Sequence, residues 1–85
     1  MSINVLITPQ AQKQIAKLSK LAQLAVVNKI RALSAGTANL QITKLSGHKD
    51  IYRVRVADYR IVYQQAGQSI TIILVKHRRD VYRGW

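Results

Sequence analysis

Basic side chains recur at short spacing in two stretches of the second half of the chain. Arg53, Arg55 and Arg60 stand in the first stretch, IYRVRVADYRIVY, which covers residues 51–63. The second stretch, KHRRDVYR at residues 76–83, supplies six further candidates: Lys76, His77, Arg78, Arg79, Tyr82 and Arg83. Guanidinium groups match the oxygens of a phosphate through paired, charge-assisted hydrogen bonds. These residue types therefore predict a phosphodiester-binding site.

A hairpin would position the first stretch. If residues 57 and 58 form a two-residue turn, the strands at residues 51–57 and 59–64 place Arg55 directly opposite Arg60. Because side chains alternate across a sheet, the intervening residues form the other face, which faces the core. That core face would carry Tyr52, Val54, Val56, Tyr59, Ile61 and Tyr63. Like charges opposed across two strands are destabilising, so the arginine face is expected to bind an anion.

A further strand, at residues 70–76, would return the second basic stretch to the same place. A turn centred on Ala66 and Gly67 would pair residue 60 with residue 73. The segment at residues 76–83 would then lie beside the arginine face and add its lysine, histidine, arginines and tyrosine to one concave patch. Lys44, in the connection before the hairpin, is a further candidate for a phosphate contact.

The few acidic residues limit the chemistry that this patch could perform. The chain contains three aspartates and no glutamate, and Asp50 and Asp58 stand roughly 26 Å apart at the two ends of one predicted strand. A two-metal nuclease needs clustered carboxylates, so that mechanism is excluded. Metal-free cleavage without any cofactor remains, in which the 2′-hydroxyl of RNA attacks the adjacent phosphorus. Such chemistry requires RNA, because DNA lacks that hydroxyl.

The overall charge indicates the kind of partner. With 14 Lys+Arg against 3 Asp+Glu, the 85 residues carry a net charge of +11, which attracts polyanions. A positive charge of this size could attract nucleic acid, an acidic protein or an anionic membrane surface. The basic residues do not line one face of an apolar helix, which disfavours binding to a membrane. The absence of cysteine excludes disulfides and thiolate metal sites. Without a signal-peptide pattern, a cytoplasmic location is expected.

The first half of the chain predicts a strand and two helices. Residues 2–7 form a short apolar strand candidate, and Thr8 with Pro9 forms a helix start. Apolar residues then recur at helical spacing up to the sequence Ser34-Ala35-Gly36, with Ser19 dividing them into a helical hairpin.

The region at residues 36–47 reads as a connection with an apolar anchor at Leu40, Ile42 and Leu45. The predicted fold is therefore a single α+β domain, residues 1–85, with the order β-α-α-β-β-β. In this fold an N-terminal helical hairpin packs on one face of a small antiparallel sheet.

Three segments together resemble one known protein family. ITKLSG at residues 42–47, IYRVRVADYRIVY at residues 51–63 and VKHRRDVYR at residues 75–83 resemble the RelE family of toxin–antitoxin ribonucleases. The resemblance covers essentially the whole chain, and the paired pattern Y-R-x-R-x-x-x-Y-R-x-x-Y and H-R-R-D-V-Y-R carries its specificity. It implies a toxin that enters the ribosomal A site, cleaves the bound mRNA and is silenced by an antitoxin encoded beside it.

The resemblance also assigns roles to individual residues. It implies catalytic roles for Arg53, Arg55, Arg60, Arg78 and Tyr82, with Arg79 competing with Arg78 because the spacing to the tyrosine is shorter than in the best-known members. Those members have lysines at the first two positions, and an arginine is a poor general base. Two residues are left as candidates for the base. Tyr82 comes first, because neighbouring arginines favour a phenolate, and His77 comes second, because its ordinary pKa suits proton transfer.

Other interpretations remain open at this stage. A ParE-like toxin with the same scaffold would act on DNA gyrase, although such proteins generally lack the arginine set and the tail tyrosine. A plain RNA-binding module would bind without cutting, but common single-strand binders display exposed aromatics, whereas alternation buries these tyrosines. Tyr82 and His77 could also be structural. The expected protein partner is an acidic, RelB-like antitoxin that covers the arginine patch or packs on the helices.

Overall fold

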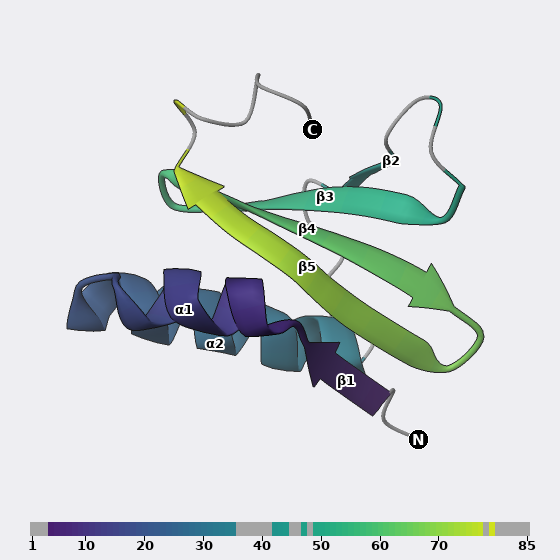
Figure 1. The fold of residues 1–85 in the computed structure, drawn as a ribbon, viewed down its shortest axis with the longest axis horizontal. Coiled ribbons are helices and arrows are strands. Elements are labelled where there is room, and N and C mark those ends of the chain that lie inside the picture. Colours follow the sequence, from purple (N-terminus) through teal and green to yellow (C-terminus); the bar gives the residue numbers. More distant parts are fainter. Residues whose placement is uncertain (1–3, 36–41, 45–46, 48, 78, 80–85) are drawn as a thin grey trace.

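A curled five-stranded sheet with two helices packed against it forms the described part of the chain (Figure 1). This computed structural model describes residues 4–35, 42–44, 47, 49–77 and 79. Its elements are β1 (Asn4–Ile7), α1 (Pro9–Ala16), α2 (Lys20–Ala35), β2 (Ile42–Lys44), β3 (Ile51–Val56), β4 (Tyr59–Ala66) and β5 (Ser69–His77). The predicted α+β class is confirmed, with one strand more than the sequence indicated.

The start of α1 follows the predicted capping pattern. The Thr8 hydroxyl accepts a hydrogen bond from the Ala11 amide at 3.1 Å, and Pro9 occupies the first turn, where it has no amide proton to leave unpaired. The same hydroxyl donates to the carbonyl of Ile73 at 2.8 Å. Thr8 therefore caps the helix and also ties it to β5.

The break between the helices lies at Ser19, as predicted. The Ser19 hydroxyl accepts from the Ala22 amide at 3.2 Å and so caps the start of α2. The side-chain amide of Gln23 donates to the carbonyls of Ile15 and Ala16, at 3.1 and 3.3 Å, and satisfies the end of α1. Neither described helix is long and apolar enough to cross a membrane.

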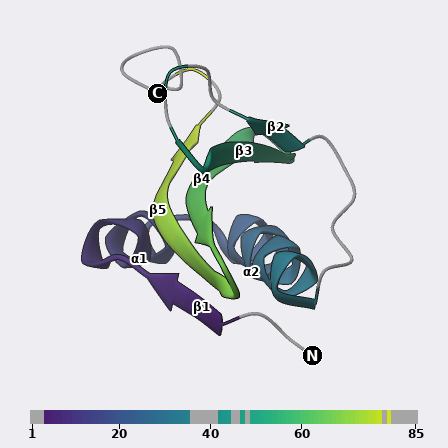
Figure 2. The same cartoon turned by 90° about the vertical axis from the view of Figure 1, so that its right-hand side faces the viewer.

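The strand order is β1-β5-β4-β3-β2, and it corrects the sequence-based prediction in two ways. The strands from β2 to β5 pair antiparallel, but β1 pairs parallel with β5. Residues 42–44, predicted as an apolar anchor within a connection, form the edge strand β2, while Leu40 and Leu45 lie outside the described residues. All three residues of β2 are exposed, so no alternation of burial marked it as a strand. Figure 2 shows β1 and β2 at the two ends of the curled sheet.

The hairpin of β3 and β4 has the predicted register, with Arg55 opposite Arg60. The next hairpin does not. Its turn lies at Gly67 and Gln68, where Gly67 has φ +58, and an irregularity between Val62 and Tyr63 shifts the pairing further. Arg60 therefore pairs with Lys76, not with residue 73.

The core lies between the helices and one face of the sheet. The tyrosines and aliphatic residues that alternation assigned to this face pack there, which confirms the prediction. The fully buried members with the largest side chains are Tyr63, Ile61, Ile70, Ile72, Val26 and Val54. A smaller cluster of Ile51, Val62 and Leu74 is separate from this core.

Candidate functional site

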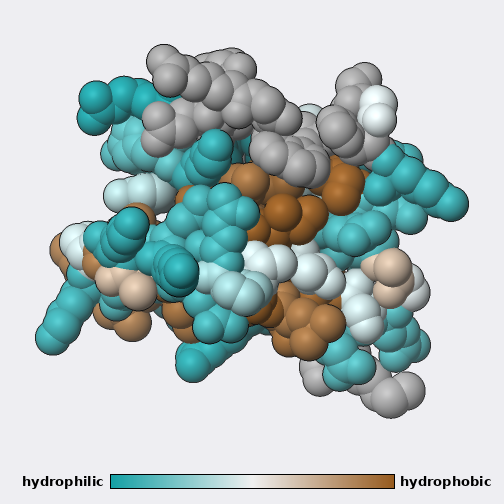
Figure 3. All heavy atoms as spheres, in the orientation of Figure 1, coloured by the Kyte–Doolittle hydropathy of each residue, from teal (hydrophilic) through white to brown (hydrophobic). Residues whose placement is uncertain are grey.

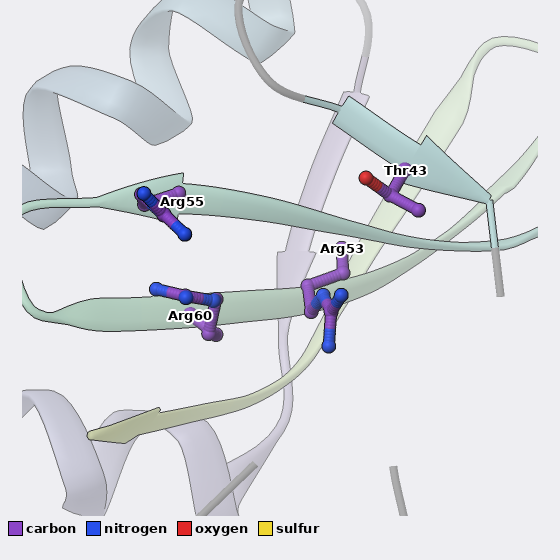
Figure 4. A pocket seen from close by; sticks show the side chains of 4 residues that line it. All are labelled: Thr43, Arg53, Arg55 and Arg60. Carbon is purple, nitrogen blue, oxygen red and sulfur yellow. The ribbon is translucent and has the colours of Figure 1, made fainter. Parts of the chain in front are cut away.

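Three arginines from two neighbouring strands line a hollow of about 290 Å³ on the face of the sheet opposite the core. Arg53 and Arg55 come from β3, Arg60 comes from β4, and Thr43 of β2 completes the described lining. Figure 4 shows the three arginine side chains along β3 and β4 with Thr43 on the adjacent strand. We call this site the arginine hollow.

The register of the strands creates this grouping. Arg55 pairs with Arg60, and Thr43 pairs with Arg53, so these side chains share one face of the pleated sheet. Adjacent strands lie about 4.8 Å apart, which brings the guanidinium groups within reach of a single phosphate. Arg60 also donates from Nη1 to the carbonyl of Tyr59 at 3.5 Å. Opposed cations are costly in the absence of an anion, and bound phosphate would offset that cost.

Thr43 is a lining residue that the sequence analysis missed. The sequence analysis predicted that the neighbouring cation, Lys44, contacts a phosphate. In the structure Lys44 pairs with Tyr52, and it therefore lies on the other face of the sheet from the arginines. Recognition of residues 42–44 as a strand paired with β3 would have identified Thr43, but a three-residue exposed strand leaves no such signal in the sequence.

The described residues of the second basic stretch do not all lie beside the arginine hollow. Lys76 pairs with Arg60 and so continues the row of cations by one strand. Arg79 is exposed beyond the end of β5, and its amide donates to Nδ1 of His77 at 3.2 Å. Arg78, Tyr82 and Arg83 lie outside the described residues, so their placement stays a prediction.

His77 lies on the other face of the sheet. It pairs with Tyr59, and the two rings meet edge to face with their centroids 5.4 Å apart. Because Tyr59 packs against the core, His77 is directed to the helix side and away from the arginines. The expected convergence of His77 on the arginine patch is therefore wrong for this geometry.

The core tyrosines take no part in the site. Tyr63 stacks on Tyr52 with ring centroids 5.6 Å apart. Burial, with a smaller contribution from Tyr52, raises the pKa of Tyr63 above its ordinary value. Its phenol is thus held in the neutral form. Among the described residues, no three histidine or carboxylate side chains gather as a metal-binding group.

Comparison with known proteins identifies relatives of this chain. A family model described as the ParE toxin of the type II toxin–antitoxin system parDE matches residues 5–82. Toxin RelE3 of Methanocaldococcus jannaschii is 37% identical over 49 residues, a match that spans 58% of this chain and only 56% of that toxin.

Solved structures share the fold over nearly the whole chain. A chain of the archaeal RelE–RelB complex from Pyrococcus horikoshii OT3 is similar with a TM-score of 0.79 and 27% identity, covering 92% of this chain and 97% of that one. A chain of the RelB–RelE antitoxin–toxin complex from Methanococcus jannaschii is similar with a TM-score of 0.76 and 25% identity, covering 91% and 94%. Two helices on a mixed sheet are thus shared with RelE toxin structures.

Proposed function

The chain belongs to the ParE and RelE toxins of type II toxin–antitoxin systems, and we propose that it is an endoribonuclease that cleaves mRNA without a metal ion. The observation that carries this proposal is the arginine hollow, in which Arg53, Arg55 and Arg60 lie together. A phosphodiester is the guest that such a group of guanidiniums fits.

The proposed reaction uses the substrate's own nucleophile. The 2′-oxygen of RNA forms a bond to the adjacent phosphorus while the bond from phosphorus to the 5′-oxygen breaks. One fragment keeps a cyclic 2′,3′-phosphate, and the other takes up a proton as a 5′-hydroxyl. Negative charge grows on the phosphoryl oxygens during this step, and the arginines of the hollow stabilise it.

The proton must be removed by a residue other than these arginines, because a guanidinium stays charged at neutral pH. Tyr82 is the proposed base, and Arg78, or Arg79 in its place, is proposed to add positive charge on the leaving side. The position of His77 beside Tyr59 makes the histidine the weaker candidate.

The proposed substrate is mRNA in the ribosomal A site. The net charge of +11 favours encounter with RNA, whose backbone is a polyanion. Lys76, Arg79 and Arg83 are proposed as additional phosphate-binding residues. Cleavage at that place would stop translation of the message.

A second candidate function is poisoning of DNA gyrase, which the match to the ParE family model favours. The arginine hollow argues against that activity, because ParE-like toxins generally lack the arginine set that lines it. A third possibility, an RNA-binding module that never cuts, would use the same hollow without a base.

The proposed protein partner is an acidic, RelB-like antitoxin. A hollow of about 350 Å³ beside the two helices is lined mostly by apolar residues such as Ile15 and Val27, and also by Arg31. Leu21 and Leu24 are also exposed on α2, and neither helix contains an acidic residue. Figure 3 shows hydrophobic side chains reaching the surface among hydrophilic ones. An amphipathic acidic helix would complement this surface, and an acidic tail would cover the arginine hollow.

Induction of the chain alone in a bacterial host tests the function. We expect growth arrest with cuts inside the reading frame of a highly translated message, detected by primer extension. Both effects should be lost in Arg60→Ala and Tyr82→Phe and kept in Lys13→Ala, which removes an exposed cation of α1. Arrest without cuts would favour gyrase as the target, and an absence of arrest would favour a binding module. Retention of cuts in Tyr82→Phe with loss in His77→Ala would reverse the order of the two bases.

A further inference from the structure

A second basic hollow, of about 440 Å³, lies where α1 meets the end of β5. The helix contributes Gln14 with the adjoining Lys17 and Leu18, and the strands contribute Tyr59, Lys76 and His77. We call this site the lysine hollow. It opens on the side of the sheet to which His77 and Tyr59 are directed, away from the arginine hollow.

The walls of the lysine hollow are fixed in place. The side-chain carbonyl of Gln14 accepts a hydrogen bond from the Val75 amide at 2.6 Å, which joins α1 to the outer edge of β5. Leu18 and Tyr59 pack against the core and form an apolar floor. A hollow whose walls are already held requires little ordering when a ligand binds, which favours affinity.

The polar groups at the rim of this hollow are donors suited to an anion. Two of the lining residues, Lys17 and Lys76, are cations, and no carboxylate is among the described residues that line the hollow. Nδ1 of His77 accepts a hydrogen bond from the Arg79 amide, so a neutral imidazole carries its proton on Nε2 and can donate from there. A phosphate group is a suitable acceptor for donors of these kinds.

Lys76 connects the two hollows. Its backbone pairs with Arg60, one strand spacing of about 4.8 Å away, so it extends the row that Arg55 and Arg60 begin. The residue is also among those that line the lysine hollow at the end of the strand. An anionic chain leaving the arginine hollow past Arg60 would meet Lys76 next and then Lys17.

We propose that the lysine hollow binds a further phosphate of the RNA strand whose scissile phosphate occupies the arginine hollow, an inference that rests on the proposed ribonuclease function. In this arrangement the arginine hollow performs the chemistry and the lysine hollow positions the strand. Interactions with a phosphate away from the cleaved bond fix register and orientation and carry no sequence preference of their own.

Binding of an uncleavable RNA tests the proposal. The probe is an octaribonucleotide with 2′-O-methyl groups, which block the attacking hydroxyl, and its affinity is measured by fluorescence anisotropy at several salt concentrations. The double variant Lys17→Gln, Lys76→Gln should bind about tenfold more weakly, and its plot of log affinity against log salt should be flatter by about 0.7 for each phosphate that the variant no longer neutralises. The wild-type His77 ring resonances should also shift when the RNA is added.

A matched control distinguishes a specific phosphate site from the general attraction of RNA to a positively charged protein. The double variant Lys13→Gln, Lys29→Gln removes the same charge from the helices at positions that line neither hollow and should bind like the wild type. If the Lys17, Lys76 variant behaves like this control while Arg55→Ala, Arg60→Ala binds weakly, the lysine hollow is not an RNA site and the proposed function stands. If only the lysine variant binds weakly, the proposed role of the arginine hollow is overturned instead. Failure of the wild type to bind the RNA would overturn both.

Discussion

The two faces of β3 and β4 are built from alternate residues of the same strands, yet one packs against the helices and the other carries the arginines. One face carries Ile61 and Tyr63, which are 0% and 2% exposed and packed under the helices. The other carries Arg55 and Arg60, which oppose each other in an open hollow. The comparison indicates that the main core and the proposed chemistry lie on opposite sides of the same two strands, although buried Val62 shares the face of the arginines.

The largest expected effect lies on the core face. Ile61→Ala should lower the free energy of unfolding by about 2–5 kcal/mol, because it removes buried methyl groups and leaves a cavity. The neighbouring substitution Arg60→Ala, one residue away, should change it by less than about 1 kcal/mol. Urea unfolding measures both. Equal decreases would show that the two faces do not divide as described.

The matching expectation for the arginine face concerns activity. Arg60→Ala should slow RNA cleavage about 100-fold, because it removes one preorganised donor to the developing phosphoryl charge. Arg60→Lys should retain part of the rate, since it keeps the charge but not the planar fork. Cleavage of a translated message, compared at equal amounts of folded protein, gives the rates. A conservative core change, Ile61→Val, serves as the control and should cleave like the wild type.

A smaller effect, an increase in stability, is expected when one of the two opposed arginines is replaced. Arg55→Gln removes one of two opposed cations and should increase the free energy of unfolding by up to about 1 kcal/mol in the absence of RNA. High salt should reduce the gain, since screening weakens the repulsion in the wild type. Lys13→Gln removes the same charge without relieving a cross-strand pair, and denaturant unfolding at low salt should show a smaller gain for it. Identical gains would argue that net charge alone is responsible.

The smallest effect concerns alkaline pH and the core face. The pKa of Tyr63 is raised in the folded state, so above about pH 10 the unfolded chain loses a proton that the folded chain retains. The unfolded state then binds fewer protons, and stability falls as the pH rises. Tyr63→Phe should show a shallower fall between pH 9 and 11, approximately the range of that ionisation, in thermal unfolding. A fall of the same slope in both proteins would assign the loss of stability to other groups.

Features that depend only on residues close together in sequence were predicted correctly. Thr8 with Pro9, the break at Ser19 and the two-residue turn after Val56 each act over a few neighbouring residues, and each was predicted correctly. The alternation of the first hairpin therefore placed Arg53, Arg55 and Arg60 together from sequence alone.

Features that depend on distant pairing were not predictable in the same way. The parallel docking of β1 on β5 joins segments more than sixty residues apart, and β2 exists only because β3 pairs with it. The shift in the second hairpin arises from a turn at Gly67 and an irregularity near Val62, and it altered the partner of Arg60. The predicted positions of two residues were wrong because they depend on strand pairing and not on neighbours in sequence. The pairing of β2 with β3 determines the face of Lys44, and the pairing of β4 with β5 determines the face of His77.

The two-residue turn between β3 and β4 also limits how this surface can evolve. Because side chains in a strand alternate with a period of two, a one-residue shift in the register of β3 would turn Arg53 and Arg55 toward the core and Tyr52 toward water. Substitutions at alternate positions leave the pairing intact. The cations of this hairpin can therefore be exchanged one at a time without a change in register, whereas a register shift would turn over every side chain of the shifted strand.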